Sequence, residues 1–433
     1  MQPFGQHLTA AWHITKAYMR TIPELMAPAG DFITLSAALR AGADAVYFGI
    51  EGTNMRAGAK NFKLSEIGRV VRECRKFGAK AYLTLNTIYF DSQQRRLTGQ
   101  IKAAKKAGVD AVIAWDFSAV ELANQIGIDV FLSTQASVAN AVAAASLYRK
   151  YGVRRFVIAR ECSLADLKRM RAGLRKILGD KAKDISIEVF AHGAMCVSIS
   201  GRCFMSEFAY GKSANRGECL QPCRRMYKIS DAQSGSPEFV IGQNYVLSPK
   251  DLMTLPFIEK LIEAGVSSLK IEGRNRNATY VWATVSAYRK ALDFYALNRR
   301  KPNFESEFKL LKDGLCKELG RAFNRGFSEG FFMGKPMGDW TSSGNKAEVK
   351  KRILGHVLNF FPKISVAEIS IDDNFLSRGD SVQVEGPSTG FAVFTADEIR
   401  LDGTAVESAQ KGSVVSVKTP QRLRRNDRLF VLR

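Results

Sequence analysis

The sequence predicts a TIM-type (β/α)8 barrel with a Cys-rich insertion after strand 7, followed by a small C-terminal all-β barrel domain. Eight short apolar runs alternate with amphipathic helical runs between Glu24 and Ile271, several helical runs end in a glycine, and the pattern after Lys346 is entirely of the β type. Eight βα units in about 250 residues are what such a barrel requires. A doubly wound open sheet is the alternative, but it normally carries a GxGxxG loop after its first strand. The segment APAGD is too short for that loop, so the barrel is favoured.

The predicted barrel strands are short apolar runs, as expected of strands buried on both faces. They are Glu24–Ala27, Ala45–Gly49, Lys80–Leu85, Ala111–Ala114, Asp129–Ser133, Arg155–Ala159, Ser186–Ala191 and Ser267–Ile271. Glycines in KFGAK, KAGVD and KYGVR are expected to cap helix C-termini in the left-handed conformation. Helix N-caps are expected at Ser65, Ser118, Ser137 and Ser163.

The regular spacing breaks after the seventh strand. About 75 residues separate His192 from the eighth strand, where roughly thirty would suffice. This insertion contains four cysteines and a predicted hairpin, Met226–Ile229 with Phe239–Ile241. A long closing helix is expected at Asn277–Leu297, with Val281 and Tyr288 on its apolar face. We therefore divide the chain into an N-terminal extension (1–22), a barrel domain (23–335) with an insertion (192–246), and a β domain (346–433).

The C-terminal segment contains six strand-like runs separated by turns such as RGD and KGS. This pattern is typical of a small β-barrel. Its last part is basic, with Lys418, Arg422, Arg424, Arg425 and Arg428 close together. Nucleic-acid binding and an inert packing role are both consistent with such a module.

The charge balance favours a polyanionic partner. The chain has 64 Lys and Arg against 42 Asp and Glu, a net charge of +22, which is typical of proteins that bind RNA or DNA. A basic but merely solvated surface is the alternative. No apolar run is long enough for a membrane span, and no secretory signal is recognisable at the start. Seven cysteines, odd in number and clustered, argue against a disulfide framework, so a cytoplasmic location is expected.

The strongest chemical signal is a cysteine cluster in a glycine-rich loop. Cys196, Cys203, Cys219 and Cys223 have the spacing C-x6-C-x15-C-x3-C. Thiolates are soft ligands, and glycine lets the backbone wrap closely around a metal or an iron–sulfur cluster. Zinc is the main alternative, but zinc ribbons normally use two CxxC pairs. The spacing therefore favours a cluster.

Polar side chains follow several predicted strands, where TIM barrels place their active sites. As a set they predict a polar pocket with fixed positive charge, suited to a small carboxylate ligand. The residues are Asn86, Asp116, Gln135, Glu161, His192, Glu272, Arg274 and Arg276. A structural cap or a loop hydrogen bond is the alternative for each one. His192 would either polarise a substrate or bond to a barrel carbonyl, and a cysteine protease would need it as the partner of a thiolate.

Longer motifs resemble those of the peptidase U32 family. They are E-x-F-x-x-G-A-M-C-x-x-x-x-G-x-C-x-M-S from Glu188 to Ser206, ELMAPAGD, ADAVYFG, NRGECLQPCR and SLKIEGRNRNATYV. The resemblance covers about residues 24–300. The family name implies collagenase-like proteolysis, whereas members with better-defined roles resemble one another as oxygen-independent hydroxylation proteins. Those members modify a tRNA wobble uridine, a 23S rRNA cytidine or the ubiquinone ring.

The resemblance implies an RNA hydroxylase with a [4Fe–4S] cluster on Cys196, Cys203, Cys219 and Cys223. NRGECLQPCR is similar to the RNA-modifying branch, so 5-hydroxyuridine formation in tRNA, with prephenate as oxygen donor, is the expected activity. The implied clamp for the donor's carboxylates consists of Arg274, Arg276, Arg160 or Arg56. The predicted catalytic residues are His192, Glu272, Arg274, Arg276, Asn86 and Gln135. The alternatives are a U32-type protease, hydroxylation of rRNA or of a quinone precursor, and a non-catalytic RNA-binding protein.

Overall fold

The computed structural model describes residues 22–227, 247–334, 339–341 and 344–433. The chain divides into two compact units, one formed by Arg20–Asp31 and Ala38–Lys346 and one that includes Ala347–Arg433. The predicted N-terminal extension and most of the predicted hairpin lie outside the described residues. No helix in the described part of the chain is long and apolar enough to cross a membrane.

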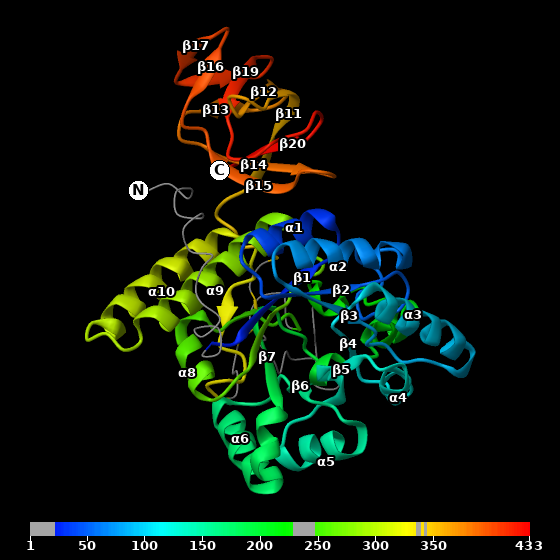
Figure 1. Ribbon diagram of the computed structural model, residues 1–433. Helices are drawn as coiled ribbons and strands as arrows, with labels where there is room; N and C mark the ends of the chain where they lie inside the picture. Colours follow the sequence, from blue (N-terminus) through cyan, green and yellow to red (C-terminus); the bar gives the residue numbers. More distant parts are fainter. Residues whose placement is uncertain (1–21, 228–246, 335–338, 342–343) are drawn as a thin grey trace, which may run out of the picture. The chain divides into compact units, whose positions relative to one another are not determined.

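The larger unit is a closed barrel (Figure 1). In its described residues eight parallel strands pair in the order β1-β2-β3-β4-β5-β6-β7-β9, and β9 closes the barrel because it also pairs with β1. The strands are β1 (Glu24–Ala29), β2 (Ala45–Gly49), β3 (Lys80–Thr84), β4 (Ala111–Ala114), β5 (Asp129–Leu132), β6 (Arg155–Val157), β7 (Ser186–Ala194) and β9 (Ser268–Ile271). All eight predicted strands are confirmed.

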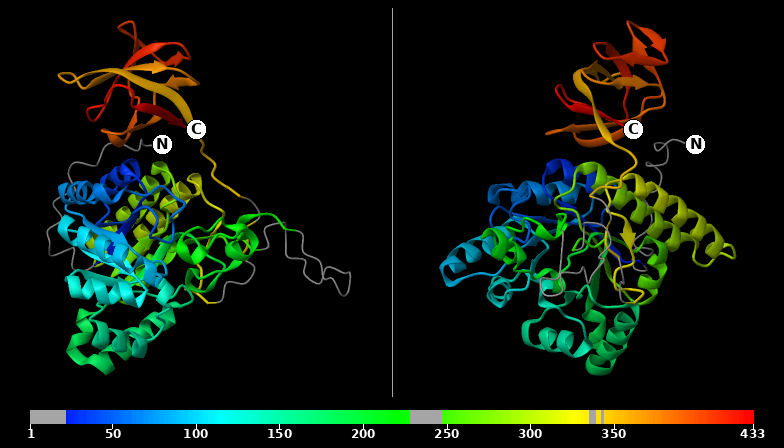
Figure 2. Two further views of the ribbon diagram at one scale, coloured as in Figure 1. Left: turned by 90° about the vertical axis from the view of Figure 1, so that its right-hand side faces the viewer. Right: turned by 180° about the vertical axis from the view of Figure 1, so that it is seen from behind.

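Helices surround the barrel (Figures 1 and 2). They are α1 (Phe32–Arg40), α2 (Ile67–Lys76), α3 (Gln94–Ala107), α4 (Phe117–Ile126), α5 (Ala141–Tyr151), α6 (Leu164–Leu178), α8 (Ile258–Glu263), α9 (Ala278–Asn298) and α10 (Phe304–Arg321). Gly108, Gly127 and Gly152 cap α3, α4 and α5 in the left-handed conformation, as predicted. The predicted closing helix is α9, and both Val281 and Tyr288 are buried.

Three of the four predicted serine N-caps are wrong. Ser163 caps α6, where its hydroxyl accepts a hydrogen bond from the backbone N–H of Asp166. At α4 the cap is Asp116, whose carboxylate accepts from the Ser118 N–H. At α5 the cap is Asn140, and Ser65 lies within a short 3-10 turn before α2. Asn and Asp are as good at this position as Ser, so residue type alone does not select among neighbouring caps.

The barrel interior combines aromatic rings with buried charges. Tyr82 and Phe131 are in edge contact, with centroids 4.7 Å apart, and the Arg155 guanidinium lies 4.1 Å from the Phe131 ring centroid. Arg155 also binds Glu24 at 2.5 Å. Next along the interior, Lys270 binds the fully buried carboxylate of Glu188 at 3.1 Å. The barrel interior at this level therefore holds ion pairs next to an apolar cluster that includes Met26 and Ile113.

The insertion between β7 and β9 adds elements that the sequence pattern did not predict. It contains α7 (Met205–Tyr210) and β8 (Asp251–Met253), which pairs antiparallel with β7 at His192–Ala194. After α10, β10 (Phe327–Ser328) pairs parallel with β8. These strands are two or three residues long, which is too short to show an alternating hydrophobic pattern in the sequence.

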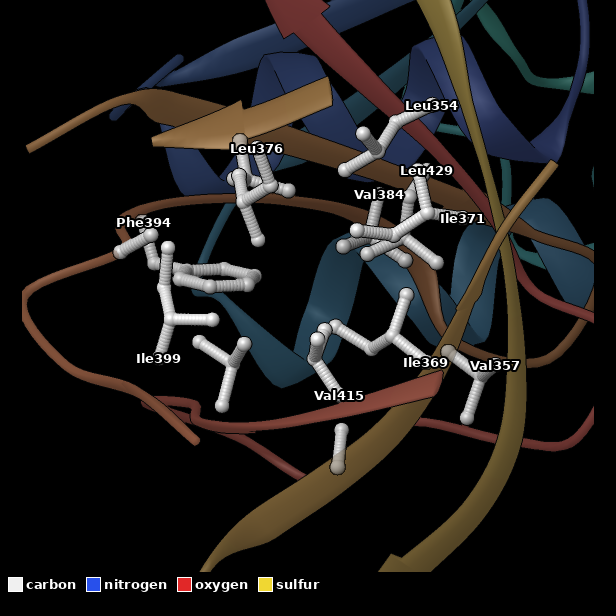
Figure 3. Packing of buried hydrophobic residues seen from close by; sticks show 14 of the residues in the cluster. Leu354, Val357, Ile369, Ile371, Leu376, Val384, Phe394, Ile399, Val415 and Leu429 are labelled. Atoms are coloured by element: carbon white, nitrogen blue, oxygen red, sulfur yellow. The ribbon is translucent and has the colours of Figure 1, made fainter. Parts of the chain in front are cut away.

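The smaller unit is all β, as predicted. Within residues 344–433 one antiparallel sheet has the order β15-β14-β20-β11-β12-β19-β16-β17, and β13 pairs with β18. The strands are β11 (Lys351–Phe361), β12 (Val366–Ile371), β13 (Phe375–Ser377), β14 (Ser381–Gly386), β15 (Gly390–Thr395), β16 (Ile399–Leu401), β17 (Thr404–Val406), β18 (Ser408–Gln410), β19 (Val414–Lys418) and β20 (Arg428–Leu432). Leu376, Ile369, Val384 and Leu429 point into one apolar core (Figure 3).

Candidate functional site

A cavity lies at the carboxyl ends of the barrel strands, which is where TIM barrels place their active sites. It has an open volume of about 890 Å³ and is bordered by strand ends and by the insertion. Most of the predicted site residues line it. They are Asn86, Gln135, Glu272, Arg274, Cys196, Cys203, Cys219 and Cys223, together with the clamp candidates Arg56 and Arg160.

Glu272 is the carboxylate of this cavity and is held ionised by arginines. Its Oε1 lies 3.0 Å from Nη2 of Arg56, and its Oε2 accepts a hydrogen bond of 3.2 Å from the Tyr47 hydroxyl. Burial acts to raise the pKa of Glu272, but the positive charges of Arg56 and Arg160, among others, outweigh it and lower the pKa to about 2. Glu272 is therefore a permanent anion that orients Arg56, and it is not suited to act as a proton donor near neutral pH.

Arg274 holds the loop after β2 in place through hydrogen bonds. It is 5% exposed and donates hydrogen bonds to Thr84 Oγ1, at 2.9 Å, and to Asn54 Oδ1. Asn54 in turn donates to the Ile50 carbonyl at 2.7 Å. Burial lowers the pKa of Arg274 to about 10, so it remains charged at neutral pH. Both of its terminal nitrogens thus donate a hydrogen bond to the protein itself.

Arg160 is the cation that remains available to a ligand. Its guanidinium lies 4.2 Å from the centroid of the Phe190 ring, and its buried Nε has no hydrogen-bond partner among the described residues. Nor does any carboxylate in the described ranges lie within ion-pair distance of it. A buried guanidinium nitrogen without a partner is costly unless a ligand supplies the acceptor. Arg160 is therefore the best-placed anchor for an anionic group.

The four cysteines converge on the same cavity from the insertion. The Cys203 thiol accepts a hydrogen bond of 3.3 Å from the Met205 N–H, and the Cys219 thiol accepts one of 3.4 Å from the Gln221 N–H. Burial raises the pKa of the Cys223 thiol to about 11 and also raises the pKa of Cys219. Backbone N–H donors to sulfur are a feature of iron–sulfur sites, where they stabilise thiolate charge.

The cysteines are not arranged around a single point. Among the described residues no group of three or more His, Cys, Asp or Glu side chains is placed to hold one metal ion. Zinc requires its four ligands within about 2.3 Å of one point, whereas a four-iron cluster binds each thiolate through a separate iron atom and holds the thiolates further apart. The donor set, four soft thiols around one cavity with N–H donors to two of them, is one that can hold an iron–sulfur cluster.

The loop that carries Cys219 docks closely on the loop after β2. The Gly58 N–H donates a hydrogen bond of 3.3 Å to the Gly217 carbonyl. Gly217 has a φ of +89°, and a Cβ on it would lie 1.9 Å from the carbonyl oxygen of Asn54. Glycine is therefore required here for both conformation and close approach.

His192 and Arg276, both predicted as catalytic, do not line the cavity. A register shift between Phe190 and His192 forms a β-bulge in β7, and a bulge reverses the inward–outward alternation of the strand. Phe190 consequently faces the cavity, whereas the His192 ring packs among Tyr280, Tyr288 and Phe327, with centroids 5.5–6.0 Å away. Arg276 stacks at 3.7 Å on the Phe323 ring.

The remaining predicted polar residues have structural contacts. Asn86 accepts a hydrogen bond of 3.2 Å from the Met55 N–H, and Gln135 accepts one from the Ser133 hydroxyl. Glu161 accepts from the Ser200 N–H at 2.8 Å and so fixes the insertion. Asp116 caps α4. Asn86 and Gln135 still border the cavity, but Glu161 and Asp116 act on the chain rather than on a ligand.

Three cavity residues were missed because they lie within strands rather than after them. Tyr47 is on β2, Thr84 on β3 and Lys270 on β9. Lys270 was detectable, since a charged residue inside the apolar run SLKI must find a partner when that run becomes a buried strand. Its partner, Glu188, also interrupts an apolar run.

Comparison with known proteins identifies one protein family and several similar proteins with different names. The sequence profile of the family described as "Peptidase family U32" matches residues 30–342. "Collagenase" from Porphyromonas gingivalis is 39% identical over 411 residues, which cover 94% of this chain and 97% of that protein. "tRNA hydroxylation protein P1" from Bacillus subtilis is 33% identical over 395 residues, covering 90% and 89%. "23S rRNA 5-hydroxycytidine C2501 synthase" from Escherichia coli is 37% identical over 270 residues, covering 62% and 39%.

Proposed function

The chain belongs to the peptidase U32 family, and from this premise we propose that it hydroxylates RNA without molecular oxygen. Two of the relatives named above carry names of RNA-hydroxylating proteins, and one of them is similar over about nine-tenths of both chains. The net charge of +22 suits an RNA substrate. The observation that carries the proposal is the cavity itself, where four cysteines meet an excess of positive charge.

In this proposal Cys196, Cys203, Cys219 and Cys223 hold a [4Fe–4S] cluster. Such a cluster supplies one-electron transfer and, where an iron is accessible, a Lewis-acid position. The protein's own contribution is to border the cluster with Arg56 and with the N–H donors of Met205 and Gln221, which stabilise its negative charge. This arrangement is supported by the shared cavity and by the soft donor set.

The co-substrate is proposed to be a small dicarboxylate, with prephenate as the candidate that the family suggests. Arg56, Arg160, Arg274 and Lys270 line the described cavity against the single carboxylate of Glu272, while Glu188 neutralises Lys270 from below. Replacing C5–H of a pyrimidine by C5–OH oxidises the base by two electrons. The oxygen donor must therefore give up one oxygen atom and accept two electrons, and Arg160 is placed to hold it during this exchange.

The proposed product is 5-hydroxyuridine at the tRNA wobble position. An anticodon base is unpaired and can enter a cavity without melting a duplex, which lowers the free energy needed to present it. The basic segment of the smaller unit, around Arg422 to Arg428, is proposed to bind the phosphate backbone. Ribosomal RNA would be the alternative substrate with the same chemistry.

Proteolysis is the second candidate, and the collagenase named among the relatives is the observation in its favour. A cysteine protease needs a thiolate beside a histidine. The His192 ring lies among aromatic side chains outside the cavity, and burial raises the pKa of Cys219 and Cys223. The described site therefore favours redox chemistry over peptide hydrolysis.

Nucleoside mass spectrometry of tRNA from a deletion strain tests the proposal. We expect 5-hydroxyuridine and its derivatives to disappear and to return with the wild-type gene but not with Cys203→Ser. Unchanged levels of these nucleosides would contradict the tRNA assignment, and a parallel measurement on rRNA would then identify or exclude the alternative substrate. Gelatin cleavage that persists in protein stripped of iron would favour the protease.

A further inference from the structure

The insertion exposes apolar side chains that no packing contact explains. Phe208 is 88% exposed, Ile199 66%, Phe204 62% and Leu220 50%. We call these four residues the apolar rim. Exposed apolar groups that gather in one short segment often mark a binding surface. Each one leaves apolar area in water in the free protein, and binding a partner would bury that area with a gain in free energy.

The rim lies beside the cavity. On α7, Met205 and Ser206 line the cavity, while Phe204 and Phe208 lie on the solvent side of the same turn of helix. The two rings are neighbours at positions i and i+4, with centroids 6.0 Å apart. An α-helix is about 10 Å across, so the rings lie within one helix width of the cavity. Figure 2 shows the described part of the insertion, up to residue 227 and coloured green, beside the barrel.

Basic side chains of the insertion stack on two further aromatic rings, outside the rim itself. The Arg225 guanidinium lies 4.7 Å from the Tyr210 ring centroid, and the Arg216 guanidinium lies 4.7 Å from the ring of Phe90, which is 58% exposed. Between Cys196 and Tyr227 the sequence has five basic residues and two acidic ones. Aromatic faces among cations match unpaired nucleotides, which offer a flat ring and a phosphate in each repeat. These two contacts and the excess of basic residues favour RNA over a protein partner.

We propose that the apolar rim stacks the unpaired bases that flank the target nucleotide in single-stranded RNA, and so directs that nucleotide into the cavity. This inference rests on the proposed function, because it takes RNA as the substrate. It assigns base stacking to Phe204 and Phe208 and leaves phosphate contacts to the neighbouring arginines. The rim then favours loops over duplexes, since paired bases present no free face.

The test compares the wild type with Phe204→Ala/Phe208→Ala, with Phe208→Trp and with Leu310→Ala. Leu310 on α10 is 76% exposed and serves as the matched apolar control. The probes are a short RNA stem–loop and its fully paired duplex, each with 2-aminopurine beside the target position. We expect the double variant to raise Kd for the loop about tenfold, consistent with lost stacking, and to lose the quenching of 2-aminopurine. Phe208→Trp and Leu310→Ala should bind the loop as the wild type does.

The outcomes separate this inference from the proposed function. If the wild type binds and hydroxylates the loop and the double variant does so equally well, the rim is not a stacking surface and the proposed function stands. If the wild type neither binds nor modifies RNA, the proposed function fails and the inference fails with it. A change in oligomeric state on Phe208→Ala, measured by light scattering, would instead identify the rim as a contact between copies and overturn the proposal.

Discussion

Nη2 of Arg56 lies 3.0 Å from Oε1 of Glu272, an ion pair that joins the loop after β2 to the end of β9 across 216 residues of sequence. The pair is only partly exposed, and Tyr47 donates a second hydrogen bond to the same carboxylate. This contact connects the first and last parts of the barrel at the cavity. It also removes Arg56 from the set of cations that are free to bind a ligand.

Breaking this ion pair should destabilise the barrel. We expect Arg56→Gln and Glu272→Gln each to lower the free energy of unfolding by about 2 kcal/mol, because each leaves a partly buried charge without its partner. The double variant should lose at least about 1 kcal/mol less than the sum, since the two residues share one interaction. Urea unfolding of the four proteins measures this coupling. Strict additivity would show that the contact contributes nothing.

Arg160 should control affinity for the anionic co-substrate. Arg160→Ala should weaken prephenate binding about 10- to 100-fold, because a charge-assisted hydrogen bond is lost, whereas Arg160→Lys should lose less. Arg95→Ala, an exposed arginine on α3, is the matched control and should bind as the wild type does. Isothermal titration calorimetry gives the affinities. Equal affinity in Arg160→Ala and the wild type would exclude Arg160 as the anchor.

The cysteine set should determine iron content. Cys196→Ser, Cys203→Ser, Cys219→Ser and Cys223→Ser should each reduce the iron bound by anaerobically purified protein well below about four atoms per chain. Cys316→Ser, at a partly buried cysteine on α10 that does not line the cavity, should leave iron content unchanged. Iron analysis and visible absorption measure the result. Stoichiometric zinc in place of iron would contradict the cluster.

Gly217 should be required for docking of the cysteine loop. Gly217 and Gly211 both have positive φ, but a Cβ at Gly211 meets nothing within 4 Å, whereas one at Gly217 meets the Asn54 carbonyl. Gly211→Ala should therefore cost only about 1–2 kcal/mol of backbone strain. Gly217→Ala should additionally displace the loop, which limited proteolysis of the insertion and iron content would reveal. Identical behaviour of the two variants would argue against the close contact.

The fold was predictable where burial left a local pattern. Strands buried on both faces read as continuous apolar runs, and the helix-ending glycines marked where each turn begins. The strands β8 and β10 left no such pattern, because two or three residues cannot show a period. The serine N-caps at Ser65, Ser118 and Ser137 were wrong because neighbouring side chains compete for the same backbone donors.

The site was predictable as a set of residue types but not as a set of orientations. The position of the four cysteines after the seventh strand predicted that they lie at the mouth of the barrel, without knowledge of any contact. The bulge that turns His192 away from the cavity arises in the β7–β9 pairing, and no residue type in the sequence predicts it. Likewise, the sequence alone does not distinguish which of Arg56, Arg160 and Arg274 is free to bind a ligand. Only their tertiary partners show that two are occupied and that Arg160 is available.

Burial of His192 should make stability depend on pH. The ring is 2% exposed, and burial together with the charge of Arg276 lowers its pKa to about 3, against an ordinary value of 6.5. The folded protein therefore binds fewer protons than the unfolded chain between these two values. Its stabilising contribution is fully present above pH 6.5 and is lost as the pH falls toward 3. The loss at pH 5 should reach about 2 kcal/mol.

The variant His192→Phe should remove this contribution to the pH dependence. The Phe ring can pack against the same neighbours, Tyr280, Tyr288 and Phe327, and it does not titrate. The readout is the slope of stability against pH between 7 and 5, so a constant cost of imperfect packing cancels. Phe327→Leu, at another ring of the same cluster, is the control: it changes the packing without removing a titratable group and should keep the wild-type slope. An unchanged slope in His192→Phe would mean that His192 binds as many protons in the folded protein as in the unfolded chain, which would contradict the effect of its burial among these rings.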